Sequence, residues 1–174
     1  PDDAGRRVVL VTGPSGAGRS SALNVLEDAG FEAIDNLPLR LIPPLFAGPQ
    51  DRRPIALGLD PRTRDFSADW IIDILAELGE TAGITAELLY LDCASDVLLR
   101  RFSETRRRHP MAEGGPPAVG IENEIFLLKP LRLRADVLID TSALTVHDLR
   151  AEVERWFSAD GKRQLNVSVQ SFSY

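Results

Sequence analysis

A short segment near the start of the chain has the residue types and spacing of a phosphate-binding loop. Residues 13–20 read Gly-Pro-Ser-Gly-Ala-Gly-Arg-Ser and fit the pattern G-x-x-x-x-G-K-[ST] at every fixed position except Arg19, which replaces lysine. Glycines allow backbone conformations in which successive N–H groups turn toward one anionic phosphate. The residues predicted to surround the phosphates are Gly13, Pro14, Ser15, Gly16, Ala17, Gly18, Arg19 and Ser20.

The segments on either side of this loop would hold it in place. Residues 7–11 form an apolar run typical of a buried parallel strand, and residues 20–29 carry apolar side chains at helical spacing. The free N–H groups and the positive end of such a helix attract an anion. We therefore predict a nucleotide site in which Arg19 reaches the β- and γ-phosphates and the Ser20 hydroxyl ligates Mg²⁺.

Arg19 changes the chemistry that the loop can perform. A lysine ammonium is a compact point charge, whereas a guanidinium is planar and favours bidentate contacts. The positive charge is retained, so we expect nucleotide binding to be retained. Hydrolysis and phosphoryl transfer need closer placement of the charge, and the sequence leaves them open.

Two aspartates follow predicted strands and are candidates for catalysis. Asp60 ends an apolar strand and is predicted to hold Mg²⁺ directly or through water, although a carboxylate that caps the following loop is the alternative. Asp35 opens the segment Asp-Asn-Leu-Pro and could orient a hydroxyl or a water molecule as a general base. The alternative is a turn in which Asp35 and Asn36 satisfy their own backbone.

Residues 100–110 contain a dense arginine cluster, Arg-Arg-Phe-Ser-Glu-Thr-Arg-Arg-Arg-His-Pro. At helical spacing Glu104 would neutralise part of this charge. The remainder, followed by a Gly- and Pro-rich stretch, is predicted to act as a lid that brings Arg101, Arg106 and Arg107 over a triphosphate. A solvated helix face is the alternative.

The composition indicates one soluble globular domain. Of 174 residues, 44% are hydrophobic and 26% are charged, and no apolar run approaches the length of a membrane span. The net charge of −6 argues against a broad nucleic-acid-binding face. The single cysteine, Cys93, excludes an internal disulfide framework and is typical of a cytoplasmic protein, and we expect it to pack at a strand end.

Predicted strands alternate with predicted helices along the whole chain. This order indicates an α/β fold of the P-loop NTPase or kinase-like class, with a parallel sheet of about five strands and helices on both faces. Ligands bind beyond the carboxyl ends of such strands. The expected strands are 7–11, 31–35, 54–60, 85–91 and 135–140, and the expected helices are 20–29, 39–46, 67–82, 95–108, 121–131 and 145–157. Ser67 is expected to cap the third of these helices, and residues 145–148 match the capping box [ST]-x-x-[DE] at the start of the last.

The chain divides into unequal parts. Residues 1–6 are predicted to be a disordered tail, and residues 7–157 the nucleotide-binding domain. Residues 109–119 are rich in proline and glycine and are expected to form a loop. Residues 158–164 are interpreted as a linker, and the alternating residues 165–174 as the start of a second, truncated domain.

Several of these segments together resemble the RapZ/YvcJ family of bacterial nucleotide-binding proteins. The resemblance spans nearly the whole chain, and its specific parts are the Asp-Asn-Leu-Pro segment and the Glu-Thr-Arg-Arg-Arg-His-Pro segment. The matching segments are residues 13–20, 35–38, 99–110, 140–142 and 170–174.

The resemblance implies a cytoplasmic P-loop protein that binds ATP and GTP and hydrolyses them weakly. It also implies that Asp60, Pro61, Arg62 and Thr63 form a second nucleotide-binding segment. Some family members are RNase adapters that bind small regulatory RNAs, mainly through a C-terminal domain.

Three functions remain open, in decreasing order of support. The first is a nucleotide-binding ATPase or GTPase of a regulatory adapter. The second is a small-molecule kinase whose acceptor lies near Asp35, and the third is an adapter for RNA or an RNase that uses nucleotide only as a switch. The sequence leaves open the choice between ATP and GTP, the partner that reads the nucleotide state, and assembly as a homo-oligomer.

Overall fold

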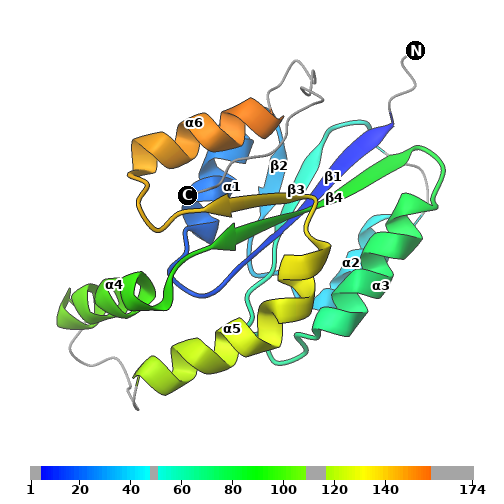
Figure 1. Ribbon diagram of the computed structural model, residues 1–174. Coiled ribbons are helices and arrows are strands. Elements are labelled where there is room, and N and C mark those ends of the chain that lie inside the picture. The colour runs from blue at the N-terminus through cyan, green and yellow to red at the C-terminus, as the bar shows by residue number, and fades with distance from the viewer. Residues whose placement is uncertain (1–4, 48–50, 109–116, 158–174) are drawn as a thin grey trace.

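Five parallel strands form the centre of the molecule, in the order β2-β3-β1-β4-β5 (Figure 1). The computed structural model describes residues 5–47, 51–108 and 117–157, and only the backbone of 106–108. The strands are β1 Arg6–Thr12, β2 Glu32–Ile34, β3 Ile55–Gly58, β4 Ile84–Asp92 and β5 Val137–Asp140. The helices are α1 Arg19–Asp28, the 3₁₀ turn η1 Leu39–Leu41, α2 Ile42–Leu45, α3 Ala68–Gly79, α4 Ser95–Arg108, α5 Pro117–Arg134 and α6 Val146–Phe157.

Strand β1 is the central strand of the sheet, because it pairs with β3 on one side and with β4 on the other. Val9 lies opposite Ala56 in β3 and opposite Glu87 in β4. Residues 8–11 have no exposed surface, as expected for a strand covered on both faces. The loop that follows β1 therefore starts from the buried centre of the sheet.

Helices cover both faces of the sheet, which confirms the predicted fold class. Helices α1 and α6 pack on one face, where Leu26, Phe31 and Phe157 are buried together. Helices α3 and α5 cover the other face, where Ile71 and Leu131 are buried (Figure 1). Since the connections are parallel crossovers, the carboxyl ends of all five strands meet at one edge.

Local sequence signals account for two helix starts. The Ser67 hydroxyl accepts a hydrogen bond from the Trp70 N–H at 3.1 Å and begins α3, as predicted. At α6, the Asp148 N–H donates to the Thr145 hydroxyl at 3.0 Å, while the Thr145 N–H donates to the Asp148 carboxylate at 3.1 Å. This reciprocal pair is the predicted capping box. Hydrogen bonding to Thr145 lowers the pKa of Asp148, which keeps the carboxylate charged at the helix start.

Several predicted boundaries differ from the structure. Strand β1 begins at Arg6, so this residue belongs to the sheet and not to the predicted tail. Helix α3 ends at Gly79, before the predicted end at residue 82. Helix α5 begins at Pro117, within the predicted loop 109–119, because proline is favoured in the first turn of a helix. Residues 1–4, 109–116 and 158–174, with the predicted linker and second domain, lie outside the described residues.

No helix in the described part of the chain is both long and apolar enough to cross a membrane.

The last residue of β3 is glycine, and two side chains occupy the space beside it. A Cβ atom on Gly58 would overlap Oδ1 of Asp35 and lie 2.6 Å from Cδ1 of Leu23. The bare backbone at Gly58 thus lets the Asp35 carboxylate lie against the end of the neighbouring strand.

We expect Gly58→Ala to lower the free energy of unfolding by about 1–3 kcal/mol, the usual effect of overpacking. Urea denaturation measures this change. The matched control is Gly79→Ala, since a Cβ there meets nothing within 4 Å, and it should leave stability unchanged or slightly raised. Equal stabilities of the two variants would contradict the steric argument.

Candidate functional site

The phosphate loop follows β1 directly and ends at the start of α1. Gly16 and Gly18 have φ angles of 92° and 114°, in the left-handed region that favours glycine. The Ala17 N–H donates to the Pro14 carbonyl at 3.0 Å and closes a tight turn inside the loop. Gly18 is the N-cap residue of α1, so the first N–H groups of the helix are directed into the loop.

Thr141, in the loop after β5, and Arg101, in α4, form hydrogen bonds with backbone carbonyls of the phosphate loop. The Thr141 hydroxyl donates to the Ala17 carbonyl at 2.7 Å. The Arg101 guanidinium donates to the carbonyls of Gly16 and Thr141, both at 2.8 Å. The structure therefore brings Arg101 to the phosphate loop, as a brace on its carbonyls. The side chains of Arg106 and Arg107, predicted to cover the phosphates, lie outside the described part of the chain.

Cys93 follows β4 beneath this brace and is buried. Burial raises the pKa of its thiol above the ordinary value, although the nearby Arg101 acts in the opposite direction. The thiol is therefore protonated and packs in the core, in agreement with the sequence-based expectation.

Arg19 lies between two carboxylates. Its Nε is 2.9 Å from Oδ1 of Asp35, and one terminal nitrogen is 3.6 Å from Oδ2 of Asp60. Only 15% of the Arg19 side chain is exposed. The strand order explains the meeting, because β3 lies between β2 and β1 and all three strands end at one edge. The structure thus brings together the three residues that the sequence nominated for catalysis.

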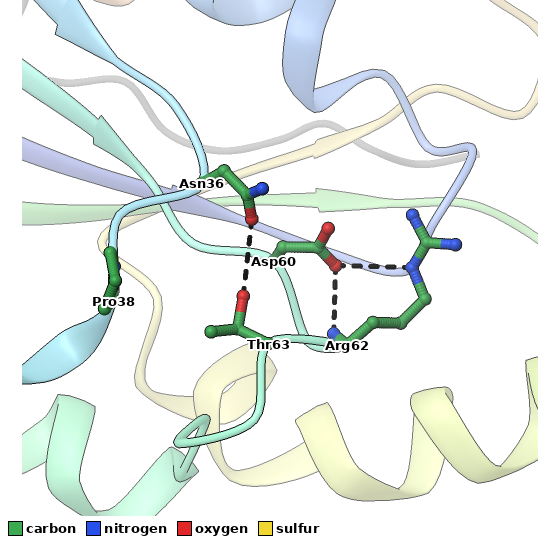
Figure 2. Close-up of a pocket in the computed structure, with 5 residues that line it drawn as sticks. All are labelled: Asn36, Pro38, Asp60, Arg62 and Thr63. Carbon is green, nitrogen blue, oxygen red and sulfur yellow. Dashed lines mark hydrogen bonds and ion pairs between the residues drawn. The ribbon is translucent and has the colours of Figure 1, made fainter.

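A pocket of about 440 Å³ opens beside this ion-pair cluster. Figure 2 shows its lining: the Thr63 hydroxyl donates to Oδ1 of Asn36 at 3.3 Å, and Oδ1 of Asp60 accepts from the Arg62 backbone N–H at 2.9 Å. Pro38 lines the pocket near Asn36. The pocket therefore joins the segment after β2 to the segment after β3, two segments that the sequence analysis considered separately.

The oxygen donors at the site fit Mg²⁺ in the company of phosphates. Ser20 lies in the first turn of α1 and is exposed, and the Asp60 carboxylate follows β3. Within the described residues no three His, Cys, Asp or Glu side chains form a metal-binding cluster. Mg²⁺ is commonly held by one or two carboxylates together with substrate phosphates, and this donor set matches that mode of binding.

The contact between Glu124 and the phosphate loop was not predicted from the sequence. Its carboxylate accepts hydrogen bonds from the Ser15 N–H at 2.8 Å and from the Ser15 hydroxyl at 3.1 Å. The two residues are 109 positions apart, and Glu124 lies in α5, which a helical pattern alone does not orient. No local signal in the sequence marks this pairing.

Relatives with more than half of their aligned residues identical to this chain are described as nucleotide-binding proteins. A nucleotide-binding protein of Roseobacter denitrificans is 64% identical over 169 residues, which cover 97% of this chain and 57% of that protein. A nucleotide-binding protein of Ruegeria pomeroyi is 60% identical over 164 residues, which cover 94% of this chain and 58% of that protein. The chain thus spans somewhat more than half the length of these relatives.

Two solved structures of small-molecule kinases have the same fold. Shikimate kinase from Acinetobacter baumannii, in complex with shikimate, matches with a TM-score of 0.57 at 17% identity, over 86% of this chain and 92% of its own. A sugar kinase from a Janibacter species matches with a TM-score of 0.56 at 16% identity, over 87% of this chain and 94% of its own. At these identities the likeness establishes the P-loop kinase-like fold alone.

The sequence profile of one family, described as the RapZ-like N-terminal domain, matches residues 6–161, and these include the phosphate loop, both carboxylates and the pocket. On this match and on the identity to its relatives, the chain belongs to the RapZ-like N-terminal domain family.

Proposed function

We propose that this chain is a domain that binds a nucleoside triphosphate with Mg²⁺ and hydrolyses it slowly, with ATP or GTP as the ligand. The observation that carries the proposal is the position of Arg19, at the end of a phosphate loop and in contact with Asp35 and Asp60. A cation and two carboxylates at one strand edge are the charges that a magnesium-bound phosphate chain requires. The description of the relatives as nucleotide-binding proteins supports the same conclusion.

Each residue at the strand edge has a role in this proposal. The loop N–H groups surround the phosphates, and Arg19 leaves its carboxylates to contact the β- and γ-phosphates. Ser20 and Asp60 would hold Mg²⁺, which supplies charge neutralisation at the phosphates when bound. Arg62 and Thr63, which line the pocket, complete the second nucleotide-binding segment.

Hydrolysis needs a group that orients water toward the terminal phosphate. Asp35 is suited to this role because its Oδ1 accepts hydrogen bonds from Arg19 and from the Asn36 N–H at 2.8 Å. Once Arg19 turns to the phosphates, the carboxylate becomes available to a water molecule. The broad guanidinium in place of an ammonium is the reason that we propose slow turnover.

In the longer protein, this domain would serve as the nucleotide-sensing part of a regulatory adapter in the cytoplasm. RNA would bind mainly through regions outside this chain, since a net charge of −6 argues against a broad nucleic-acid-binding face here, and we assign an RNase partner to the same regions.

Replacing Arg19 tests the proposal directly. We expect Arg19→Ala to reduce phosphate release from ATP and GTP by about a hundredfold, the usual cost of losing one group that stabilises charge in the transition state. Arg19→Lys should retain turnover or increase it, because the ammonium restores the phosphate-loop pattern. Phosphate release with Mg²⁺ is the measurement.

The matched control is Arg150→Ala, which removes an exposed arginine paired with Asp28 at 2.9 Å and should leave turnover unchanged. If the unchanged protein binds nucleotide without turnover and only Arg19→Lys hydrolyses it, the domain is a nucleotide switch and the proposal of hydrolysis fails.

The pocket favours a small-molecule kinase as a second candidate function. Its lining offers the Arg62 guanidinium, the Thr63 hydroxyl and the Asn36 amide next to the catalytic carboxylates, and its volume suits a small hydroxylated acceptor. In such a reaction Asp35 would accept the proton of the attacking hydroxyl while the terminal phosphoryl group passes from the nucleotide to the acceptor oxygen.

If this candidate is correct, an acceptor from a panel of sugars and hydroxy acids should raise ADP formation at least about tenfold above the rate with water. Thr63→Val, which removes the hydroxyl and keeps the shape, should abolish this increase, measured as the ratio of stimulated to basal ADP formation in the same variant. ADP formation that no compound stimulates would exclude the acceptors tested and leave hydrolysis as the activity.

A further inference from the structure

The phosphate loop contacts a carboxylate of the same chain, that of Glu124. Both hydrogen-bond donors of Ser15, the backbone N–H and the hydroxyl, are directed at the two carboxylate oxygens of Glu124, at 2.8 and 3.1 Å. Donors in a loop of this kind normally serve phosphate oxygens. The Glu124 carboxylate therefore occupies donors that a phosphate group would otherwise use.

The helix that carries Glu124 is fixed in place. Leu128 and Leu131 of α5 are fully buried against the sheet and α3. Nε of Arg132 lies 2.9 Å from the Asp92 carboxylate at the end of β4. Glu124 itself is half-buried, so its contact with Ser15 is a built part of the site and not a chance meeting of two mobile surface groups.

The charge of Glu124 also affects the surroundings of the loop. Burial raises the pKa of Tyr90 far above its ordinary value; the negative charges of Asp92 and Glu124 add to this increase, and Arg132 opposes it. The Glu124 carboxylate therefore lies close enough to the end of β4 for its charge to act on the buried Tyr90.

We propose that Glu124 is a specificity-determining residue of the site, whose carboxylate stands in for the terminal phosphate and selects against nucleoside triphosphates relative to diphosphates. The inference rests on the proposed function, since it assigns a nucleotide to the loop. In this proposal we assign the inner phosphates to the helix start and Ser20, and the terminal phosphate to Ser15 in the first half of the loop. A triphosphate must displace the carboxylate or bear its repulsion, whereas a diphosphate ends before reaching it.

The test compares two ligands on two variants. Dissociation constants with Mg²⁺ are measured by calorimetry for ADP and for the non-hydrolysable imido analogue of ATP. Glu124→Gln removes the charge and keeps the shape, so we expect it to tighten binding of the ATP analogue about tenfold. Binding of ADP should change by less than about threefold, because the diphosphate does not meet this residue. Glu124→Ala, which also vacates the space, should have at least as large an effect.

The control is Glu122→Gln, an equal change of charge at an exposed position on the same helix, and it should alter neither constant. A merely structural role for Glu124, as a support of the loop, predicts a parallel loss of affinity for both ligands. Parallel changes or no change would overturn the inference while leaving nucleotide binding intact. Failure of both ligands to bind the unchanged protein would instead overturn the proposed function, and the inference with it.

Discussion

The arrangement of the site depends on one guanidinium that meets carboxylates from two strand ends at once. Arg19 lies 2.9 Å from Asp35 and 3.6 Å from Asp60. This is geometrically possible because β3 lies between β2 and β1, so the phosphate loop and both carboxylates converge at one edge. A planar guanidinium presents donors along two edges, whereas an ammonium offers a compact charge. Arginine at this position is therefore suited to its acidic neighbours as well as to phosphate.

The conformation of the loop that carries Arg19 is supported by residues near β5, at the other end of the strand order from β2 and β3. Thr141 and Arg101 bond to the carbonyls of Ala17 and Gly16, which turns these oxygens away from the interior of the loop. These hydrogen bonds hold the backbone of the loop in one conformation. Such preorganisation reduces the conformational cost of binding an anion. In the structure Arg101 positions the loop through these carbonyls, and its contact with nucleotide stays a prediction.

Periodicity and capping signals predicted the fold class and most element positions, because these depend on neighbours in the sequence. Buried β1 and the cap at Thr145 are examples. The order of the strands is a property of the whole chain, and it decided that Asp35 and Asp60 share Arg19. The contact of Glu124 with Ser15 depends on how α5 rotates as it packs on β4 and α3. Side-chain pairings of this kind follow from tertiary packing and leave no periodic trace in the sequence.

The charges of the site favour an exchange of partners over a simple gain of contacts. In the structure, the Arg19 cation is paired with two carboxylates, and the Ser15 donors are satisfied by Glu124. In the proposed function, Arg19 would pass from the carboxylates to the phosphates, and Asp60 would exchange the guanidinium for Mg²⁺. Each new contact then replaces an existing one, so the net free energy of binding is smaller than the number of contacts indicates. Under the proposed function, a site balanced in this way would respond to changes in nucleotide concentration, whereas rapid turnover would require the cation to be committed to the phosphate from the start.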